Sequence, residues 1–262
     1  MQEELRITVG ALTDVGQVRD HNEDALGTHQ PREREVLAER GRLYLVADGM
    51  GGHVAGEVAS ECVVKTVTAS YYESHAQTVR QGLSEAIQQA NTILYEASSG
   101  EESRRKMATT LVGAVLLGRQ LHVANIGDSR AYLLRGDIIR QLTEDHSFVA
   151  ELVKLGRISE EEAASHPQRN VVTRALGTQP TVEADFYEEA IQPGDTVILC
   201  TDGLWGEVSE EEMAQMATQP LNPKEMASEV VALANQRGGP DNITVIVLQI
   251  GEPSPLAHLL DQ

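Results

Sequence analysis

A short apolar run that leads directly into an aspartate and three glycines constrains this chain more than any other feature. Residues 43–53 read LYLVADGMGGH, which predicts a buried strand ending at Asp48. The pattern returns at 197–203, VILCTDG, where Asp202 follows the strand, and Asp241 stands just before a third apolar run. Because the end of one antiparallel strand lies beside the start of its neighbour, we expect these three carboxylates to meet at one edge of a sheet.

Carboxylates that lie close together repel one another, and a cation normally holds such a group in place. Oxygen ligands favour Mg²⁺ or Mn²⁺, and the eight scattered histidines and the absence of a Cys-x-x-Cys pair give no support to a zinc site. Two such ions ~4 Å apart, bridged by one carboxylate, would lower the pKa of a shared water and give a hydroxide suited to in-line attack on phosphorus. Arg19, close to Glu23 and Asp24, is the first candidate for binding phosphate oxygens.

The order of the expected elements indicates the fold class. Two amphipathic helices, at about 58–70 and 78–98, follow the first strands, and several antiparallel strands come next. Helices at 210–217 and 223–236 precede the last strand. This is an α+β pattern, and it favours two packed sheets with helices outside. We expect a single domain over 1–251, with a polar insertion at about 146–178 that could cover a site and a loose tail at 252–262.

Several features have both a structural and a functional interpretation. An Asp-Gly pair after one strand is commonly only a turn, but three such sites beside strands are not explained by turns alone. Gly127-Asp128 is predicted as a hairpin turn or as part of a metal site, and Gly136-Asp137 as a hairpin turn. Trp205 is expected to pack in the core, and 30–41 to form a surface loop.

Charge and composition exclude some classes of partner. The net charge of −19 over 262 residues argues against binding nucleic acid or an anionic membrane, because both surfaces would repel the chain. Cys62 and Cys200 are the only cysteines, and we expect two buried free thiols in a reducing compartment. No signal sequence and no run of ~20 apolar residues is found, so we expect a soluble cytoplasmic protein.

The ordered set of motifs resembles the metal-dependent protein phosphatase (PPM, type 2C) family of serine/threonine phosphatases, in its compact bacterial form. The resemblance extends from about Ile7 to Ile250. The matching motifs are Arg19-x-x-Asn22-Glu23-Asp24, Val46-Ala47-Asp48-Gly49-Met50-Gly51-Gly52, Met107-Ala108-Thr109-Thr110, Ile126-Gly127-Asp128-Ser129-Arg130, Cys200-Thr201-Asp202-Gly203-Leu204-Trp205 and Gly239-Pro240-Asp241-Asn242-Ile243-Thr244.

The resemblance implies a four-layer αββα sandwich of two antiparallel sheets flanked by helix pairs, with a flap at 146–178 beside the active site. It also implies two core Mn²⁺ or Mg²⁺ ions. Asp48 would bridge them, the Gly49 carbonyl would bind the first, and Asp202 and Asp241 would bind the second.

The same resemblance gives roles to four further residues. Glu23 and Asp24 match an acidic pair that binds metal directly or through water. Asp128, together with Asp202, matches a weaker third metal site, and Arg19 matches the arginine that binds phosphate.

The sequence departs from the family at the residue after Asp48-Gly49. Eukaryotic members place a histidine there as general acid, whereas this chain has Met50, as bacterial members do, and its nearest histidine is His53. The acid for the leaving group is therefore either His53 or a metal-bound water, and His53 taken alone also fits a structural or exposed histidine.

These observations predict a monomeric phosphatase that hydrolyses phosphoserine and phosphothreonine in proteins without a phosphoenzyme. Its expected partners are phosphorylated proteins, including a serine/threonine kinase or the substrates of such a kinase. Two alternatives remain open. One is a catalytically silent binding module on the same fold, and the other is a two-metal hydrolase of small phosphoesters or nucleotides.

Overall fold

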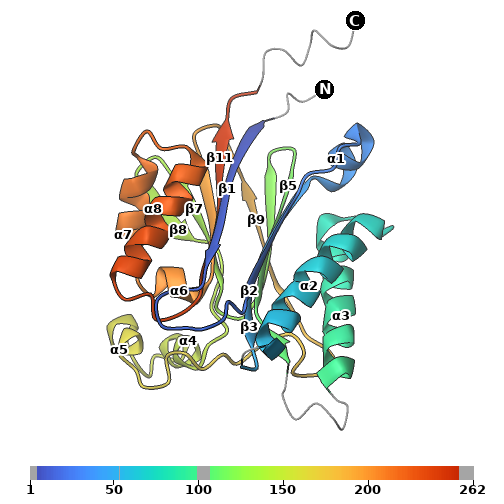
Figure 1. Cartoon of the computed structure of the whole chain (residues 1–262). Helices are drawn as coiled ribbons and strands as arrows, with labels where there is room; N and C mark the ends of the chain where they lie inside the picture. The colour runs from blue at the N-terminus through green and yellow to red at the C-terminus, as the bar shows by residue number, and fades with distance from the viewer. Residues whose placement is uncertain (1–4, 53, 99–106, 254–262) are drawn as a thin grey trace, which may run out of the picture.

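Two antiparallel sheets pack face to face, and a pair of helices covers the outer face of each sheet (Figure 1). The computed structural model describes residues 5–52, 54–98 and 107–253. One apolar core lies between the sheets, and a second and a third lie between each sheet and its helices. This is the α+β, four-layer arrangement that the sequence predicts.

The first sheet has six strands and lies under two long helices. Its strand β3 is apolar at almost every position because both of its faces are buried: Leu43 and Leu45 pack toward the helices, whereas Tyr44 and Val46 face the other sheet. The strands follow the order β2 (Asp24–His29), β3 (Arg42–Met50), β5 (Leu111–Leu117), β6 (Gln120–Ile126) and β9 (Asp185–Ala190), with β4 (Ala108–Thr109) paired to β3; the helices are α2 (Val54–Glu73) and α3 (Val79–Ser98).

The second sheet has five strands, and the same alternation builds it. In its strand β11, Ile246 and Leu248 face the first sheet, whereas Val245 and Val247 pack toward the outer helices. The strands follow the order β1 (Arg6–Asp14), β11 (Ile243–Gly251), β10 (Thr196–Cys200), β7 (Arg130–Arg135) and β8 (Ile138–Gln141); the outer helices are α7 (Glu210–Ala217) and α8 (Pro223–Gln236).

The insertion lies across one end of the sandwich. It contains the short helices α4 (Phe148–Lys154) and α5 (Glu160–Ala164), and its two ends pair at the isolated bridge between Ser147 and Val172. Figure 1 shows α4 and α5 at the end of the molecule opposite the start of β1 and the end of β11. Strand ends and loops from both sheets reach this end, and they carry the residues of the site.

Three features differ from the sequence-based expectations. The stretch expected as a loop at 30–41 contains helix α1 (Arg34–Arg40), and β2 is a strand that the hydrophobic pattern did not reveal. Gly127-Asp128 is not a hairpin turn, because β6 and β7 belong to different sheets and the chain crosses between them there. Gly136-Asp137 does join the antiparallel pair β7 and β8, as predicted. No helix in the described ranges is both long and apolar enough to cross a bilayer.

Candidate active site

Two of the expected acidic residues face each other across neighbouring strands of the six-stranded sheet. The register of β2 and β3 places Asp24 directly opposite Asp48, so their side chains lie on the same face. Asp24 is buried, and the Thr201 hydroxyl donates to its Oδ2 atom at 2.9 Å. The main chain of Asp48 is held at both ends, since its N–H donates to Thr110 Oγ1 at 2.9 Å and its carbonyl accepts from the Thr110 N–H at 2.9 Å. Gly49, which follows it on β3, pairs with Thr109 of β4.

Two more acidic residues come from the five-stranded sheet. Asp202 follows β10 as the first residue of the short helix α6 (Asp202–Trp205), and Asp241 lies in the loop before β11. A Cβ atom on Gly203 would lie only 2.0 Å from the Asn242 carbonyl oxygen, so glycine is what allows these two loops to pack together. The sequence led us to expect the carboxylates at one edge of a single sheet, and this expectation is wrong. They come from both sheets and meet at one end of the sandwich.

Asp128 completes the acidic group from the crossover between the sheets. Its side chain is buried, and its carbonyl oxygen accepts a hydrogen bond from Trp205 Nε1 at 3.0 Å. Trp205 packs against the helix-side core, as expected, but it also lines the cavity and stacks on the Arg130 guanidinium, whose Cζ atom lies 3.6 Å from the ring centroid. The tryptophan thus has a structural role at the site as well as in the core.

Burial and the repulsion between neighbouring charges make four of these carboxyl groups hard to ionise. Burial raises the pKa of Asp24 to about 7, that of Asp128 to about 8 and that of Asp202 to about 6. The pKa of Asp48 is also raised well above its usual range, by burial and then by the charges of Asp202, Asp24, Asp128 and Asp241. Asp48 therefore lies close enough to four other acidic side chains for their charges to act on it.

The acidic group fits a hard divalent cation in its chemistry. Asp24 Oδ1 and Asp202 Oδ1 are buried and have no hydrogen-bond partner among the described residues, which is the condition that a cation relieves. In the described part of the chain, no group of three or more His, Cys, Asp or Glu side chains is already arranged so that it could hold a metal ion. The donor atoms are thus oxygens of the kind that such an ion prefers, and they lie close together.

The remaining predicted residues lie around this group. The Arg19 side chain is 50% exposed, and its Nη2 atom lies 2.7 Å from Asp241 Oδ2. The main chain of Glu23 accepts from the Gly49 N–H at 3.1 Å and donates to Asn242 Oδ1 at 2.7 Å. These bonds join the loop before β2 to both sheets. His53 lies outside the described residues.

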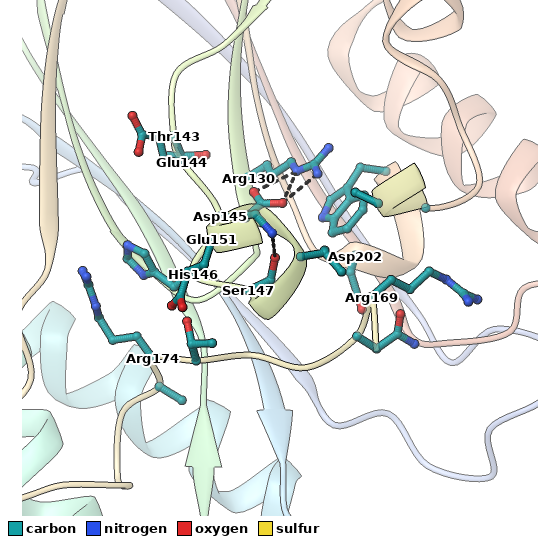
Figure 2. A pocket seen from close by; sticks show the side chains of 18 of the residues that line it. Arg130, Thr143, Glu144, Asp145, His146, Ser147, Glu151, Arg169, Arg174 and Asp202 are labelled. Atoms are coloured by element: carbon teal, nitrogen blue, oxygen red, sulfur yellow. Dashed lines mark hydrogen bonds and ion pairs between the residues drawn. The ribbon is translucent and has the colours of Figure 1, made fainter. Parts of the chain in front are cut away.

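A cavity of about 1600 Å³ opens from the acidic group and runs under the insertion. Arg19, Asp202 and Asp241 line one part of it, and residues of the insertion such as Arg169 line another. Figure 2 shows Arg130 and Asp145 joined in the cavity wall, where the guanidinium donates to both carboxylate oxygens. A cavity of this volume has room for a chain segment, and not only for a phosphate group, beside the acidic residues.

Some supporting residues were not identified from the sequence as part of the site. The Asn242 side chain donates to the carbonyls of Val15 and His21, at 2.9 Å each, and so fixes the loop that carries Arg19. The Thr110 and Ser129 hydroxyls lie 2.7 Å apart and connect the Asp48 strand to the Asp128 crossover. Asn242, Thr110 and Ser129 each belong to one of the motifs shared with the family. In those motifs, however, only the acidic residues suggest chemistry by themselves.

Comparison with known proteins defines the class. The profile of the family described as Protein phosphatase 2C matches residues 9–243. The chain is 40% identical to the serine/threonine phosphatase stp of Listeria innocua over 241 residues, which cover 90% of this chain and 93% of that protein. The serine/threonine phosphatase of S. agalactiae has a structure with a TM-score of 0.86 at 34% identity, over 93% of this chain and 99% of that one.

A further solved structure is the catalytic domain of the serine/threonine protein phosphatase PstP in complex with two manganese ions. It has a TM-score of 0.80 at 34% identity, over 95% of this chain and 100% of that one. The class is therefore that of metal-dependent serine/threonine phosphatases. Within it, the chain belongs to the Protein phosphatase 2C family.

Proposed function

We propose that this chain hydrolyses phosphoserine and phosphothreonine in proteins by direct attack of water on phosphorus, with no phosphoenzyme. The observation that carries the proposal is the buried acidic group at the cavity, in which Asp24 and Asp202 each have a carboxylate oxygen without a hydrogen-bond partner among the described residues. When bound, two Mn²⁺ or Mg²⁺ ions, with a weaker third, would supply the Lewis acidity that lowers the pKa of a water.

Different residues of the chain would bind the different ions. Asp48 would serve both core ions, because it lies close enough to Asp202, Asp24, Asp128 and Asp241 for their charges to act on it. Among the remaining ligands, the Gly49 carbonyl would belong to the first core ion and Asp202 and Asp241 to the second, Glu23 and Asp24 would bind directly or through water, and Asp128 would serve the third.

Arg19 is the residue that we assign to the phosphate. Its guanidinium lies at the cavity edge and is half exposed, so a phosphate can reach it from solvent. The phosphate group of a substrate can bind the Arg19 guanidinium while Asp241 is still bound to it. Arg19 has further N–H donors besides the one that bonds the Asp241 carboxylate. The proton for the leaving hydroxyl remains assigned to His53 or to a water.

The substrate class follows from the cavity and the relatives. A cavity of about 1600 Å³ accommodates several residues of a peptide, and the similar proteins are named serine/threonine phosphatases. We therefore assign phosphorylated proteins as substrates, among them a serine/threonine kinase or its targets. Residues 1–251 would form the catalytic domain, with 146–178 as a flap over the cavity. A monomer suffices, because one chain supplies every residue that the proposal uses.

A comparison of substrates tests this proposal. With Mn²⁺ present, we expect faster turnover of phosphothreonine and phosphoserine peptides than of nucleotides, because a nucleotide would leave most of the cavity unfilled. Acid quenching during turnover of a ³²P-labelled peptide should give labelled phosphate and no labelled protein. Faster turnover of nucleotides, or label retained on the protein, would contradict the proposal.

A further inference from the structure

The Asp128 crossover is held by a residue to which neither the resemblance nor the proposed function gives a role. His146 makes two hydrogen bonds to Gly127: its Nδ1 atom accepts from the Gly127 N–H at 3.0 Å, and its own N–H donates to the Gly127 carbonyl at 2.9 Å. Gly127 has a φ of +100°, and a Cβ atom there would lie 2.5 Å from Thr110 Cγ2. The peptide that leads into Asp128 is therefore fixed in an orientation that glycine alone adopts easily.

The same contacts determine the protonation state of the His146 ring. Because Nδ1 accepts a hydrogen bond, the ring hydrogen is on Nε2, which lies 3.2 Å from Asp185 Oδ2. Asp185 Oδ1 in turn accepts from Arg174 Nη1 at 2.8 Å. His146 is buried, and burial lowers its pKa, so the neutral ring that this geometry needs is also the favoured one.

His146 also closes the base of the insertion. Its carbonyl oxygen accepts from the Thr173 N–H at 2.8 Å, next to the bridge between Ser147 and Val172. His146 therefore contacts the Asp128 crossover on one side and both ends of the insertion on the other. Figure 2 shows His146 and Arg174 beside the cavity.

We propose that His146 is a positioning residue for Asp128, and that the hydrogen bond from the Gly127 N–H to Nδ1 is the contact that sets the Asp128 carboxylate for metal binding. The proposal rests on the proposed function in one respect, namely that Asp128 is a metal ligand. The bond from Nε2 to Asp185 has the lesser role of fixing the ring tautomer. Removing an outer partner of this kind typically lowers metal affinity by about 10–100-fold.

Two substitutions separate the two ring nitrogens. His146→Asn places an amide oxygen near the position of Nδ1 and keeps the acceptor for Gly127, whereas His146→Gln places its amide near Nε2 and keeps only the contact with Asp185. We would measure Mn²⁺ binding to the full chain without substrate, from the electron paramagnetic resonance signal of free Mn²⁺. We expect the weakest class of bound Mn²⁺ to lose about ten-fold or more in affinity in His146→Gln, and less than about three-fold in His146→Asn.

Three further proteins complete the experiment. Asp128→Asn defines the loss expected when the ligand itself is removed, and adding His146→Gln to it should cause little further loss. His122→Gln is the matched control, because His122 lies on β6 with Nδ1 3.3 Å from Glu188 Oε1 and does not contact the crossover. Thermal unfolding, followed by the fluorescence of Trp205, establishes that each variant is folded.

The outcomes separate this inference from the proposed function. Equal Mn²⁺ affinity in His146→Gln and in the wild type, with a loss in Asp128→Asn, would overturn the role of His146 alone. Equal losses in His146→Asn and His146→Gln would also overturn it, because the Nδ1 contact would then not be the one that matters. Unchanged Mn²⁺ binding in Asp128→Asn would overturn the assignment of Asp128 and this inference with it.

Discussion

At the scale of single residues, the site depends on neutral groups that support the acidic ones. Thr201 is an example, because its buried hydroxyl donates to Asp24 Oδ2 at 2.9 Å and accepts from the Thr244 N–H at 3.0 Å. Asp24 Oδ1 has no hydrogen-bond partner within the described residues. The Thr201 hydroxyl therefore stabilises the carboxylate through its other oxygen, Oδ2. The acidic residues were apparent in the sequence, but this support was not.

Replacing Thr201 by valine tests that support. Thr201→Val preserves the shape of the side chain but removes a donor to Asp24 and leaves the Thr244 N–H without its acceptor. We expect the free energy of unfolding at neutral pH to fall by about 1–3 kcal/mol, as for other buried polar groups that lose a partner. Urea unfolding in chelator measures it. Thr201→Ser keeps the hydroxyl and should lose much less; a loss in Thr201→Ser as large as that in Thr201→Val would contradict the prediction, because removing the methyl group would then cost as much as removing the hydroxyl.

At the scale of elements, local signals predicted the helices well and the strand partners poorly. The start of α8 was readable because Asn222, Pro223 and Glu225 form a capping sequence, and the Asn222 side chain accepts from the Lys224 and Glu225 N–H groups. Strand β2 was missed because Gly27, Thr28 and His29 interrupt its apolar pattern. The alternation in β6 and β7 says which side is buried but not which sheet each strand joins.

The cap of α8 gives a prediction at this scale. Asn222→Ala should lower the free energy of unfolding by about 1 kcal/mol, because two N–H groups in the first turn lose their acceptor. It should leave kcat/KM unchanged, since α8 covers the outer face of the sandwich. Urea unfolding and peptide turnover check the two parts. Glu229→Ala, at an exposed position of the same helix, is the control and should stay within about 0.5 kcal/mol. A loss of turnover in Asn222→Ala would contradict this separation.

At the scale of the whole molecule, the acidic group couples stability to pH and to metal. The folded chain raises the pKa of Asp24 to about 7, that of Asp128 to about 8 and that of Asp202 to about 6, whereas an unfolded aspartate has a pKa of about 3.9. Between these values the folded state holds protons that the unfolded state has released. Stability without metal should therefore fall as pH rises from about 4 to about 8, and should change little from these groups above that range.

Thermal unfolding at pH 5 and pH 8 tests this coupling. In chelator, we expect a lower Tm at pH 8 than at pH 5. Added Mn²⁺ should raise Tm at pH 8 by more than at pH 5, because the ion binds the ionised carboxylates of the folded state and competes with protons at lower pH. The same Mn²⁺ effect at both pH values would show that the acidic group is not where the ion binds.

How much of the site could be predicted also depends on scale. Asp48, Asp202 and Asp241 could be predicted because each stands beside an apolar strand, and the structure brings them into one acidic group with Asp24 and Asp128. Their origin in two different sheets could not, because strand order is decided by packing between segments far apart in the sequence. The roles of His146 and Trp205 needed the distances to Gly127 and Asp128, which no local pattern contains.

The central claim is that the acidic group makes this chain a metal-dependent phosphatase. The most direct test is phosphate release from a phosphothreonine peptide, in Mn²⁺ and then in excess chelator, for the wild type and for Asp202→Asn. We predict release by the wild type in Mn²⁺, and loss of almost all of it in chelator and in Asp202→Asn. Activity that persists in chelator, or wild-type activity in Asp202→Asn, would contradict the claim.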